Sequence, residues 1–137
     1  MKRAGAKPAF YFGEDMKSIT IRSFAKVNLS IDVKGLLPNG YHEVEMVMQQ
    51  VGLFDEVNVT FEPGEVTEVK VHTNLPYLPT DERNLAHKAA TFFMKNCVYK
   101  IPNTVHGIIS IDIKKRVPVA AGLAGGSGNG AAVRTVS

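Results

Sequence analysis

A glycine-rich stretch near the end of the sequence is the first candidate for chemistry. Residues 118–132 read PVAAGLAGGSGNGAA, in which five glycines accompany a single Ser127 and a single Asn129. The stretch follows an alternating strand pattern and precedes the start of a helix. Glycine lets the backbone approach a ligand closely, and the free N–H groups at a helix N-terminus favour negative charge. The pattern predicts a phosphate-binding loop, with a plain flexible loop as the alternative.

This stretch matches neither of the two common nucleotide-binding motifs. No lysine follows its last glycine, so it is not the GxxxxGK[ST] loop. The dinucleotide fingerprint needs a surrounding parallel βαβ unit, and we expect none around these residues. Spacing alone therefore leaves phosphate binding and a plain loop equally open.

Lys26 and Asn28 form a second candidate site. They are two residues apart in an alternating segment, so both side chains point to the same side of a strand. A lysine beside an amide can hold a phosphate or orient a hydroxyl group. The alternative is an ordinary solvated strand face, because most charged surface residues serve solubility.

Tyr41 and His42 are a third candidate, directly after the turn signal Pro38-Asn39-Gly40. An aromatic ring beside an imidazole can stack on a base and hydrogen-bond to it. Packing at the end of a hairpin is the alternative use of such a tyrosine.

Periodicity predicts the elements that must position these residues. Alternation over 19–33 indicates a half-buried strand, with Ile19, Ile21 and the later odd-numbered apolar residues on one face. A helix over 84–97 can be capped by Thr80 or Asp81. The prediction is an α+β fold with a mainly antiparallel sheet, one central helix, and a Gly-rich loop leading into a second, truncated helix. Further strands are expected over 43–51, 55–61, 67–73 and 107–117, and the second helix over 131–137.

Composition limits the class of protein. At 137 residues the chain is one domain or part of one, and its net charge of +3 is too mild to imply nucleic-acid binding. The single Cys97 excludes an internal disulfide, the four histidines have no metal-ligand spacing, and no apolar run approaches the roughly 20 residues that cross a bilayer. We expect a cytoplasmic protein without a membrane anchor. Residues 1–15 have no periodic pattern and are interpreted as an extension or leader, with the domain over 16–137.

Four segments in this order resemble one enzyme family. AKVNLSIDV, PNGYHEVEMVMQQVGLFDEV, DERNLAHKAA and KKRVPVAAGLAGGSGNGAA are similar to the N-terminal portion of the 4-diphosphocytidyl-2-C-methyl-D-erythritol kinases, of the GHMP kinase superfamily. The resemblance runs from about Ile19 to Val133. It implies the GHMP kinase N-terminal domain, with the fold of domain 2 of ribosomal protein S5.

The resemblance also implies an activity and site residues. The family transfers a phosphoryl group from ATP, with Mg²⁺, to the 2-hydroxyl of 4-diphosphocytidyl-methylerythritol in non-mevalonate isoprenoid biosynthesis. Lys26 and Asn28 would be catalytic, Tyr41 would stack on the cytosine, and His42 would hydrogen-bond to it. No metal-ligating residue is predicted. The ATP-binding residues would be Asn84, Lys115, Pro118, Gly122, Leu123, Ala124, Gly125, Gly126, Ser127 and Gly128.

Two departures from the family pattern shape the expectation. The family loop usually reads G-G-S-S-(D/N)-A-A, so a hydroxyl is lost at Gly128 and a helix-favouring alanine at Gly130. The family's catalytic aspartate, in a G-(A/S)-D-V motif, has no counterpart among the 137 residues. We therefore expect this chain alone to be inactive, and its surface to favour self-association where a C-terminal domain would pack. Two alternatives remain open: another GHMP kinase of a small alcohol, and a non-catalytic nucleotide-binding fragment.

Overall fold

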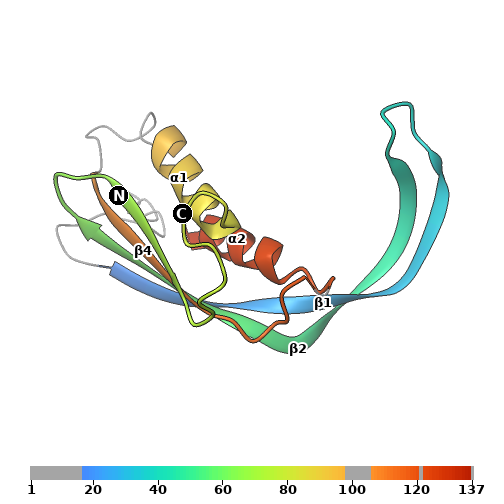
Figure 1. The fold of residues 1–137 in the computed structure, drawn as a ribbon, viewed down its shortest axis with the longest axis horizontal. Helices are drawn as coiled ribbons and strands as arrows, with labels where there is room; N and C mark the ends of the chain where they lie inside the picture. Colours follow the sequence, from blue (N-terminus) through green and yellow to red (C-terminus); the bar gives the residue numbers. More distant parts are fainter. Residues whose placement is uncertain (1–16, 98–105, 121, 137) are drawn as a thin grey trace, which may run out of the picture.

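A four-stranded sheet with two helices on one face forms the body of the chain (Figure 1). The computed structural model describes residues 17–97, 106–120 and 122–136. The strands are β1 (Lys17–Leu36), β2 (His42–Pro63), β3 (Glu68–Thr73) and β4 (Gly107–Lys114), and the helices are α1 (Leu85–Cys97) and α2 (Gly125–Val136). The predicted α+β class is confirmed. The leader predicted at residues 1–15 lies outside the described residues.

The sheet is mixed, with the strand order β1-β2-β4-β3. β2 runs antiparallel to β1 and to β4, whereas β3 runs parallel to β4. The expectation of a mainly antiparallel sheet therefore fails at its β3 edge. β3, α1 and β4 form a parallel βαβ unit that was not predicted, and the glycine-rich stretch follows this unit rather than lying within it. A strand of six residues gives too little pattern to reveal its pairing partner.

The core lies between the sheet and the helices. Ile109, Ile111 and Ile113 point from β4 towards the helices and are at most 6% exposed, as the alternation predicted. Because β4 is the strand between β2 and β3, this isoleucine row forms the floor on which both helices pack. The remaining core side chains are Val57, Phe61, Val71, Ala86, Ala90, Met94, Ala132 and Val133.

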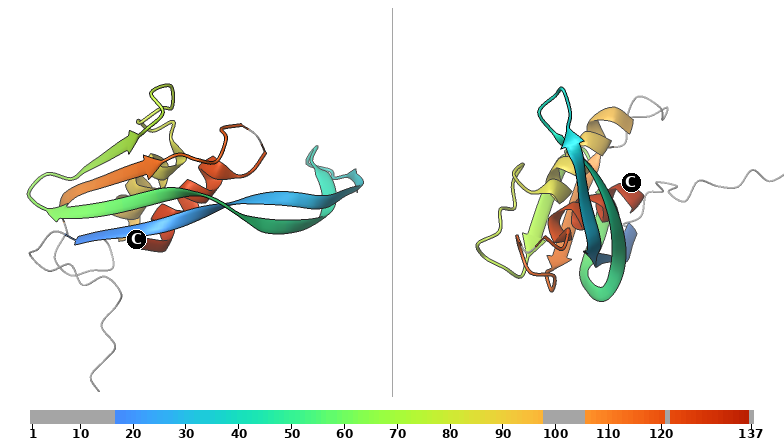
Figure 2. Two further views of the ribbon diagram at one scale, coloured as in Figure 1. Left: turned by 90° about the horizontal axis from the view of Figure 1, so that it is seen from below. Right: turned by 90° about the vertical axis from the view of Figure 1, so that its right-hand side faces the viewer.

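β1 and β2 continue past the body as a two-stranded hairpin (Figures 1 and 2). The two strands predicted over 43–51 and 55–61 are one continuous strand, β2. In this hairpin arm, which we define as residues 29–48, the half-buried face predicted for β1 is exposed. Ile31 is 54% exposed and Val33 is 58% exposed, and their partners across the ladder are Met46 and Val44. The alternation is therefore correct as strand pattern, but nothing in the described chain covers this half.

Candidate nucleotide pocket

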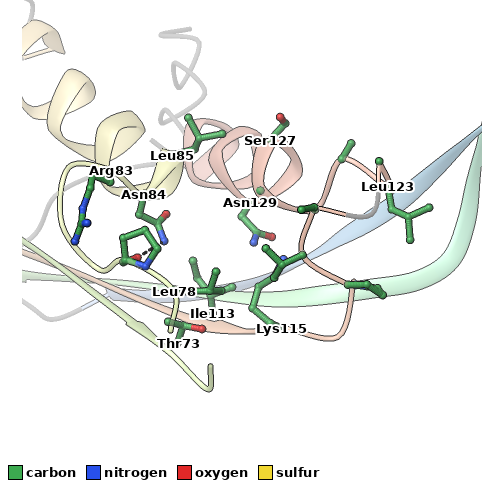
Figure 3. A pocket seen from close by; sticks show the side chains of 18 residues that line it. Thr73, Leu78, Arg83, Asn84, Leu85, Ile113, Lys115, Leu123, Ser127 and Asn129 are labelled. Atoms are coloured by element: carbon green, nitrogen blue, oxygen red, sulfur yellow. Dashed lines mark hydrogen bonds between the residues drawn. The ribbon is translucent and has the colours of Figure 1, made fainter. Parts of the chain in front are cut away.

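A pocket of about 330 Å³ opens where the segment after β4 meets the N-terminus of α2 (Figure 3). It lies within the usual size range of small-molecule sites. It collects the residues predicted to bind ATP, all except Gly128. Its lining consists of Thr73, Leu78, Pro79, Arg83, Asn84, Leu85, Ile113, Lys115, Pro118, Val119, Ala120, Gly122, Leu123, Ala124, Gly125, Gly126, Ser127 and Asn129.

The glycine-rich stretch is divided between a loop and a helix. α2 begins at Gly125, so Gly125 to Gly128 form its first turn, and the loop ends with Ala124. The predicted helix start at 131 was therefore six residues late. The glycines at the start of α2 do not indicate a helix, because each costs about 1 kcal/mol in a helix relative to alanine. The first N–H groups of a helix have no acceptor within the helix, so this end offers donors to the pocket.

The loop before α2 has an unusual backbone. Ala120, Gly122 and Ala124 all have φ between +58° and +70°. This left-handed region costs an L-residue such as alanine roughly 1–2 kcal/mol. Such strain concentrates at ligand-binding and active sites. The Ala124 carbonyl accepts from Gly128 N–H (2.8 Å), which closes the first turn of α2.

Three of the α2 glycines allow close packing. A Cβ at Gly125 would stand 3.0 Å from Lys115 Nζ, and a Cβ at Gly130 would stand 3.3 Å from Leu85 Cβ. A Cβ at Gly128 would meet Ser23 Oγ at 2.6 Å. These glycines therefore seat α2 against the pocket wall, α1 and β1. Gly126 is different, because its Cβ would have nothing within 4 Å.

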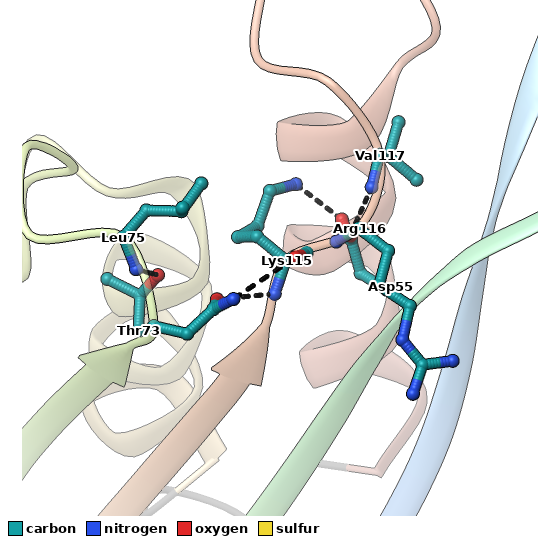
Figure 4. Close-up of polar contacts among 7 residues, drawn as sticks. Asp55, Thr73, Leu75, Lys115, Arg116 and Val117 are labelled. Atoms are coloured by element: carbon teal, nitrogen blue, oxygen red, sulfur yellow. Dashed lines mark hydrogen bonds and ion pairs between the residues drawn. The ribbon is translucent and has the colours of Figure 1, made fainter.

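A buried ion pair lies behind the pocket (Figure 4). Lys115 Nζ donates to Asp55 Oδ2, and the two side chains are 4% and 0% exposed. Asp55 Oδ1 accepts from the backbone N–H groups of Arg116 (2.6 Å) and Val117 (2.8 Å). Sequence reasoning missed Asp55, because nothing in the local pattern of DEVNVTF separates a buried aspartate from an exposed one.

Asn84 caps α1. Its Oδ1 accepts from Ala86 N–H (2.9 Å), and its Nδ2 donates to the Pro79 carbonyl (2.9 Å). The prediction that Thr80 or Asp81 caps this helix was wrong, because α1 begins at Leu85. Asn84 lines the pocket, but both of its amide atoms already have partners inside the protein.

Asp81 instead holds the segment that leads into α1. It pairs with Arg83, another pocket residue that the prediction did not include, at 2.8 Å. Side-chain hydrogen bonds from Arg83 lower the pKa of Asp81 to about 2, and the same pair raises the pKa of Arg83.

Lys26 and Asn28 lie next to the pocket rather than on its lining. Lys26 Nζ donates to Asn28 Oδ1 (3.3 Å), so the side chains do point the same way. The backbone N–H of Lys26 donates to the Leu123 carbonyl (3.2 Å). This bond ties the pocket loop to β1 at the predicted catalytic lysine.

Tyr41 and His42 lie far from this pocket, at the tip of the hairpin arm (Figure 1). The turn forms as its sequence predicted: Gly40 has φ of 82°, and Asn39 Oδ1 accepts from Tyr41 N–H (3.1 Å). Tyr41 is 73% exposed. The structure therefore does not bring this pair to the glycine-rich end.

Asn129 is a pocket residue that sequence reasoning named but gave no role. It is 4% exposed, and its Oδ1 has no hydrogen-bond partner in the described part of the chain. A buried acceptor without a partner costs about 1–3 kcal/mol. Its position four residues after Gly125 places both on one face of α2.

The described residues contain no cluster of three or more His, Cys, Asp or Glu side chains that could hold a metal ion. The pocket lining includes Ser127 and Asn129, but no carboxylate. Mg²⁺ is usually held by one or two carboxylates together with substrate phosphates. By themselves, these residues therefore do not make a Mg²⁺ site.

Comparison with known proteins identifies the proteins that this chain resembles. The chain is 45% identical over 118 residues to the 4-diphosphocytidyl-2-C-methyl-D-erythritol kinase of Alkaliphilus metalliredigens, and 47% identical over 116 residues to that of Lachnospira eligens. These matches cover 86% and 85% of the chain. The chain resembles the N-terminal portion of these kinases. It spans 38% of the length of both relatives, and no family model matches it.

Solved structures agree with this relationship. A crystal structure of 4-(cytidine 5'-diphospho)-2C-methyl-D-erythritol kinase superposes with a TM-score of 0.64 at 32% identity, over 85% of this chain and 38% of that one. Homoserine kinase from Cytophaga hutchinsonii has a TM-score of 0.58 at 16% identity, over 90% of this chain and 35% of that one. At that identity the likeness concerns the fold alone. The fold is of the GHMP kinase type, as the resemblance implied.

None of the described helices is long and apolar enough to span a membrane.

Proposed function

We propose that the chain is the nucleotide-binding portion of a kinase that phosphorylates 4-diphosphocytidyl-2-C-methyl-D-erythritol at its 2-hydroxyl, with ATP as donor. The observation that carries this proposal is the convergence of the predicted ATP-binding residues on one pocket at the α2 N-terminus. The helix end supplies N–H donors to phosphate oxygens. A single cysteine is consistent with a cytoplasmic location, which forms part of the proposal.

The substrate would occupy the space beside Lys26 and Asn28. Lys26 is connected through the Leu123 carbonyl to the loop that would enclose the phosphates, so a phosphoryl group and an acceptor hydroxyl could meet there. Positioning and charge stabilisation supply most of the catalysis in phosphoryl transfer. Tyr41 and His42 would bind the cytosine, which requires the hairpin arm to lie against the substrate.

Mg²⁺ would be held mainly by the phosphates of ATP, since the pocket lining lacks a carboxylate.

Gly126 provides the sharpest test of nucleotide binding. A side chain there has open space around it and lines the pocket at the helix N-terminus. Gly126→Glu places a negative charge where the phosphates would bind, and Gly126→Gln is the matched neutral control. We expect Gly126→Glu to weaken ADP binding by about tenfold relative to Gly126→Gln in isothermal titration calorimetry, and adenosine binding much less. Equal ADP affinities for the two variants would contradict phosphate binding at this helix end.

The cytidyl substrate separates this proposal from another GHMP kinase of a small alcohol. Tyr41 and His42 have a role only if the ligand carries a cytosine. CDP binding that is weakened by Tyr41→Ala would support the cytidyl substrate. CDP binding no tighter than that of inorganic pyrophosphate would support the small-alcohol kinase.

The hairpin arm supports a second part of the proposal, self-association of the lone chain. An isolated two-stranded ribbon is marginal in water, and the apolar face of this one is exposed. A second copy of the chain offers the same apolar face, and pairing the two would remove both from water.

A further inference from the structure

We propose that Asp55 is the positioning residue of the nucleotide pocket: it holds the Lys115 ammonium behind Gly125, so that Lys115 presents its aliphatic stem, and not its charge, to the nucleotide. The inference rests on the proposed function for the identity of the ligand. It goes beyond that function by assigning Asp55, which lies on β2 and outside the pocket lining.

Burial and bonding fix the direction of the Lys115 side chain. Its ammonium donates to a carboxylate that is 0% exposed, and the lysine side chain itself is 4% exposed. A buried ammonium is costly without a charged partner, so the ammonium stays with Asp55. The part of Lys115 left to line the pocket is its methylene stem.

The backbone at Lys115 is fixed as well. Its N–H donates to Asn74 Oδ1 (2.7 Å), and its carbonyl accepts from Asn74 Nδ2 (3.2 Å). Asp55 continues this support by accepting from the next two N–H groups, those of Arg116 and Val117. The chain therefore leaves β4 in one direction, towards Pro118 and the loop (Figure 4).

The same carboxylate makes the close approach of Lys115 to α2 possible. The ammonium lies 3.0 Å from the position of a Cβ on Gly125, the first residue of the helix. A cation is unfavourable at a helix N-terminus, and a carboxylate is favourable. Asp55 compensates the lysine there, which leaves the helix end positive enough for phosphate.

This arrangement predicts a pocket in which Lys115 contributes little to phosphate recognition. The readout is the preference of the chain for ADP over adenosine, measured by isothermal titration calorimetry. Lys115→Met alone would leave the Asp55 carboxylate buried without a charged partner beside the helix end, so the lysine is replaced in the Asp55→Asn background. Asp55→Asn should free the ammonium to reach the phosphates, and raise the preference about threefold or more.

The double variant Asp55→Asn/Lys115→Met should lose that gain. It also protects the test against misfolding, because it removes both charges and leaves none buried alone. Asp112→Asn, a substitution of an exposed residue on β4 outside the pocket, is the matched control. It should change the affinity for neither ADP nor adenosine. A double variant whose ADP preference falls about tenfold below that of the native chain would overturn the inference, because the ammonium of the native chain would then face the phosphates.

Hydrogen exchange tests the positioning role without a ligand. The amides of Arg116 and Val117 should exchange about tenfold faster in Asp55→Ala than in the native chain, and Asp55→Asn, which keeps an acceptor oxygen, should recover much of the protection. If the native chain binds neither ADP nor adenosine, the proposed function fails for this chain, and the exchange rates still decide whether Asp55 holds the loop. Unchanged exchange in Asp55→Ala would refute that role.

Discussion

Ser23 Oγ lies 2.6 Å from the position that a Cβ on Gly128 would take. Ser23 is 7% exposed on β1, and Gly128 is in the first turn of α2. The glycine therefore lets the helix rest against the serine. The family pattern has a serine at position 128, where this chain has glycine. The hydroxyl of Ser23 on β1 lies beside that position.

This contact predicts that the two positions are energetically coupled. Gly128→Ala alone should destabilise the fold by about 1–2 kcal/mol, because the new methyl group overlaps Ser23 Oγ by more than the helix propensity of alanine can offset. In the Ser23→Ala background the nearest atom is the residue 23 Cβ at 3.9 Å, an ordinary contact. There, Gly128→Ala should stabilise by up to about 1 kcal/mol. Urea unfolding of the four variants measures the coupling.

Gly126→Ala is the matched control for that cycle. It is in the same turn of α2, and its Cβ meets nothing within 4 Å. It should raise stability slightly in both the native and the Ser23→Ala backgrounds, with no coupling. Additive effects of Ser23→Ala and Gly128→Ala would show that the contact has no energetic weight.

The α2 glycines also show which part of the pocket the sequence did not predict. The family resemblance implied which residues bind ATP, and the pocket brings together all of them except Gly128. The sequence pattern did not predict that Gly125 to Gly130 are helical, because their low propensity outweighs any local signal. The reason for these glycines lies in Ser23, Leu85 and Lys115, which reach α2 only through the fold.

Asp55 and the hairpin arm also depend on tertiary contacts that local sequence patterns do not contain. The buried partners of Asp55 are 60 to 62 positions later in the chain, beyond any periodicity. The alternation of 19–33 predicted strand correctly, but period two does not reveal whether a neighbour covers the apolar face. Exposure of Ile31 and Val33 is therefore a result of tertiary structure that the sequence pattern could not contain.

Asn84 should be important to stability apart from any ligand. Asn84→Ala removes the acceptor for Ala86 N–H and the donor to the Pro79 carbonyl, and should cost about 1–2 kcal/mol. Asn84→Asp keeps an acceptor at the helix N-terminus and should recover most of that loss. Chemical unfolding measures both. Equal losses for Asn84→Ala and Asn84→Asp would contradict the capping role.

The Asp81–Arg83 pair should make stability depend on pH in acid. The folded pKa of Asp81 is about 2, below its ordinary value of 3.8, because Arg83 hydrogen-bonds to the charged carboxylate. A lowered folded pKa means that the stabilisation is fully present above the unfolded pKa, and is lost as the pH falls from about 4 to about 2. Thermal unfolding midpoints of the native chain and Asp81→Asn should therefore converge over that range.

Arg83→Gln is the control for this pH dependence, since it removes the partner and keeps the carboxylate. It should flatten the same part of the pH profile and leave the rest unchanged. Because the pair is exposed, about 1 M salt should reduce the effect. A native chain and an Asp81→Asn variant that differ by the same amount at pH 2 and pH 4 would exclude the pair as the cause.

The hairpin arm should drive concentration-dependent association. Ile31 and Val33 pair across the ladder with Met46 and Val44 and form its exposed apolar face. The neighbouring positions in the ladder are charged: Lys34 bridges Asp32 (2.5 Å) and Glu45 (3.0 Å), which raises the pKa of Lys34. Because only the apolar face gains from burial, Ile31→Lys or Val33→Lys should shift the chain to monomer in sedimentation velocity across a range of concentrations. Val66→Lys, at a similarly exposed apolar site outside the arm, should leave the association unchanged. A native chain that stays monomeric at every concentration would disprove the association.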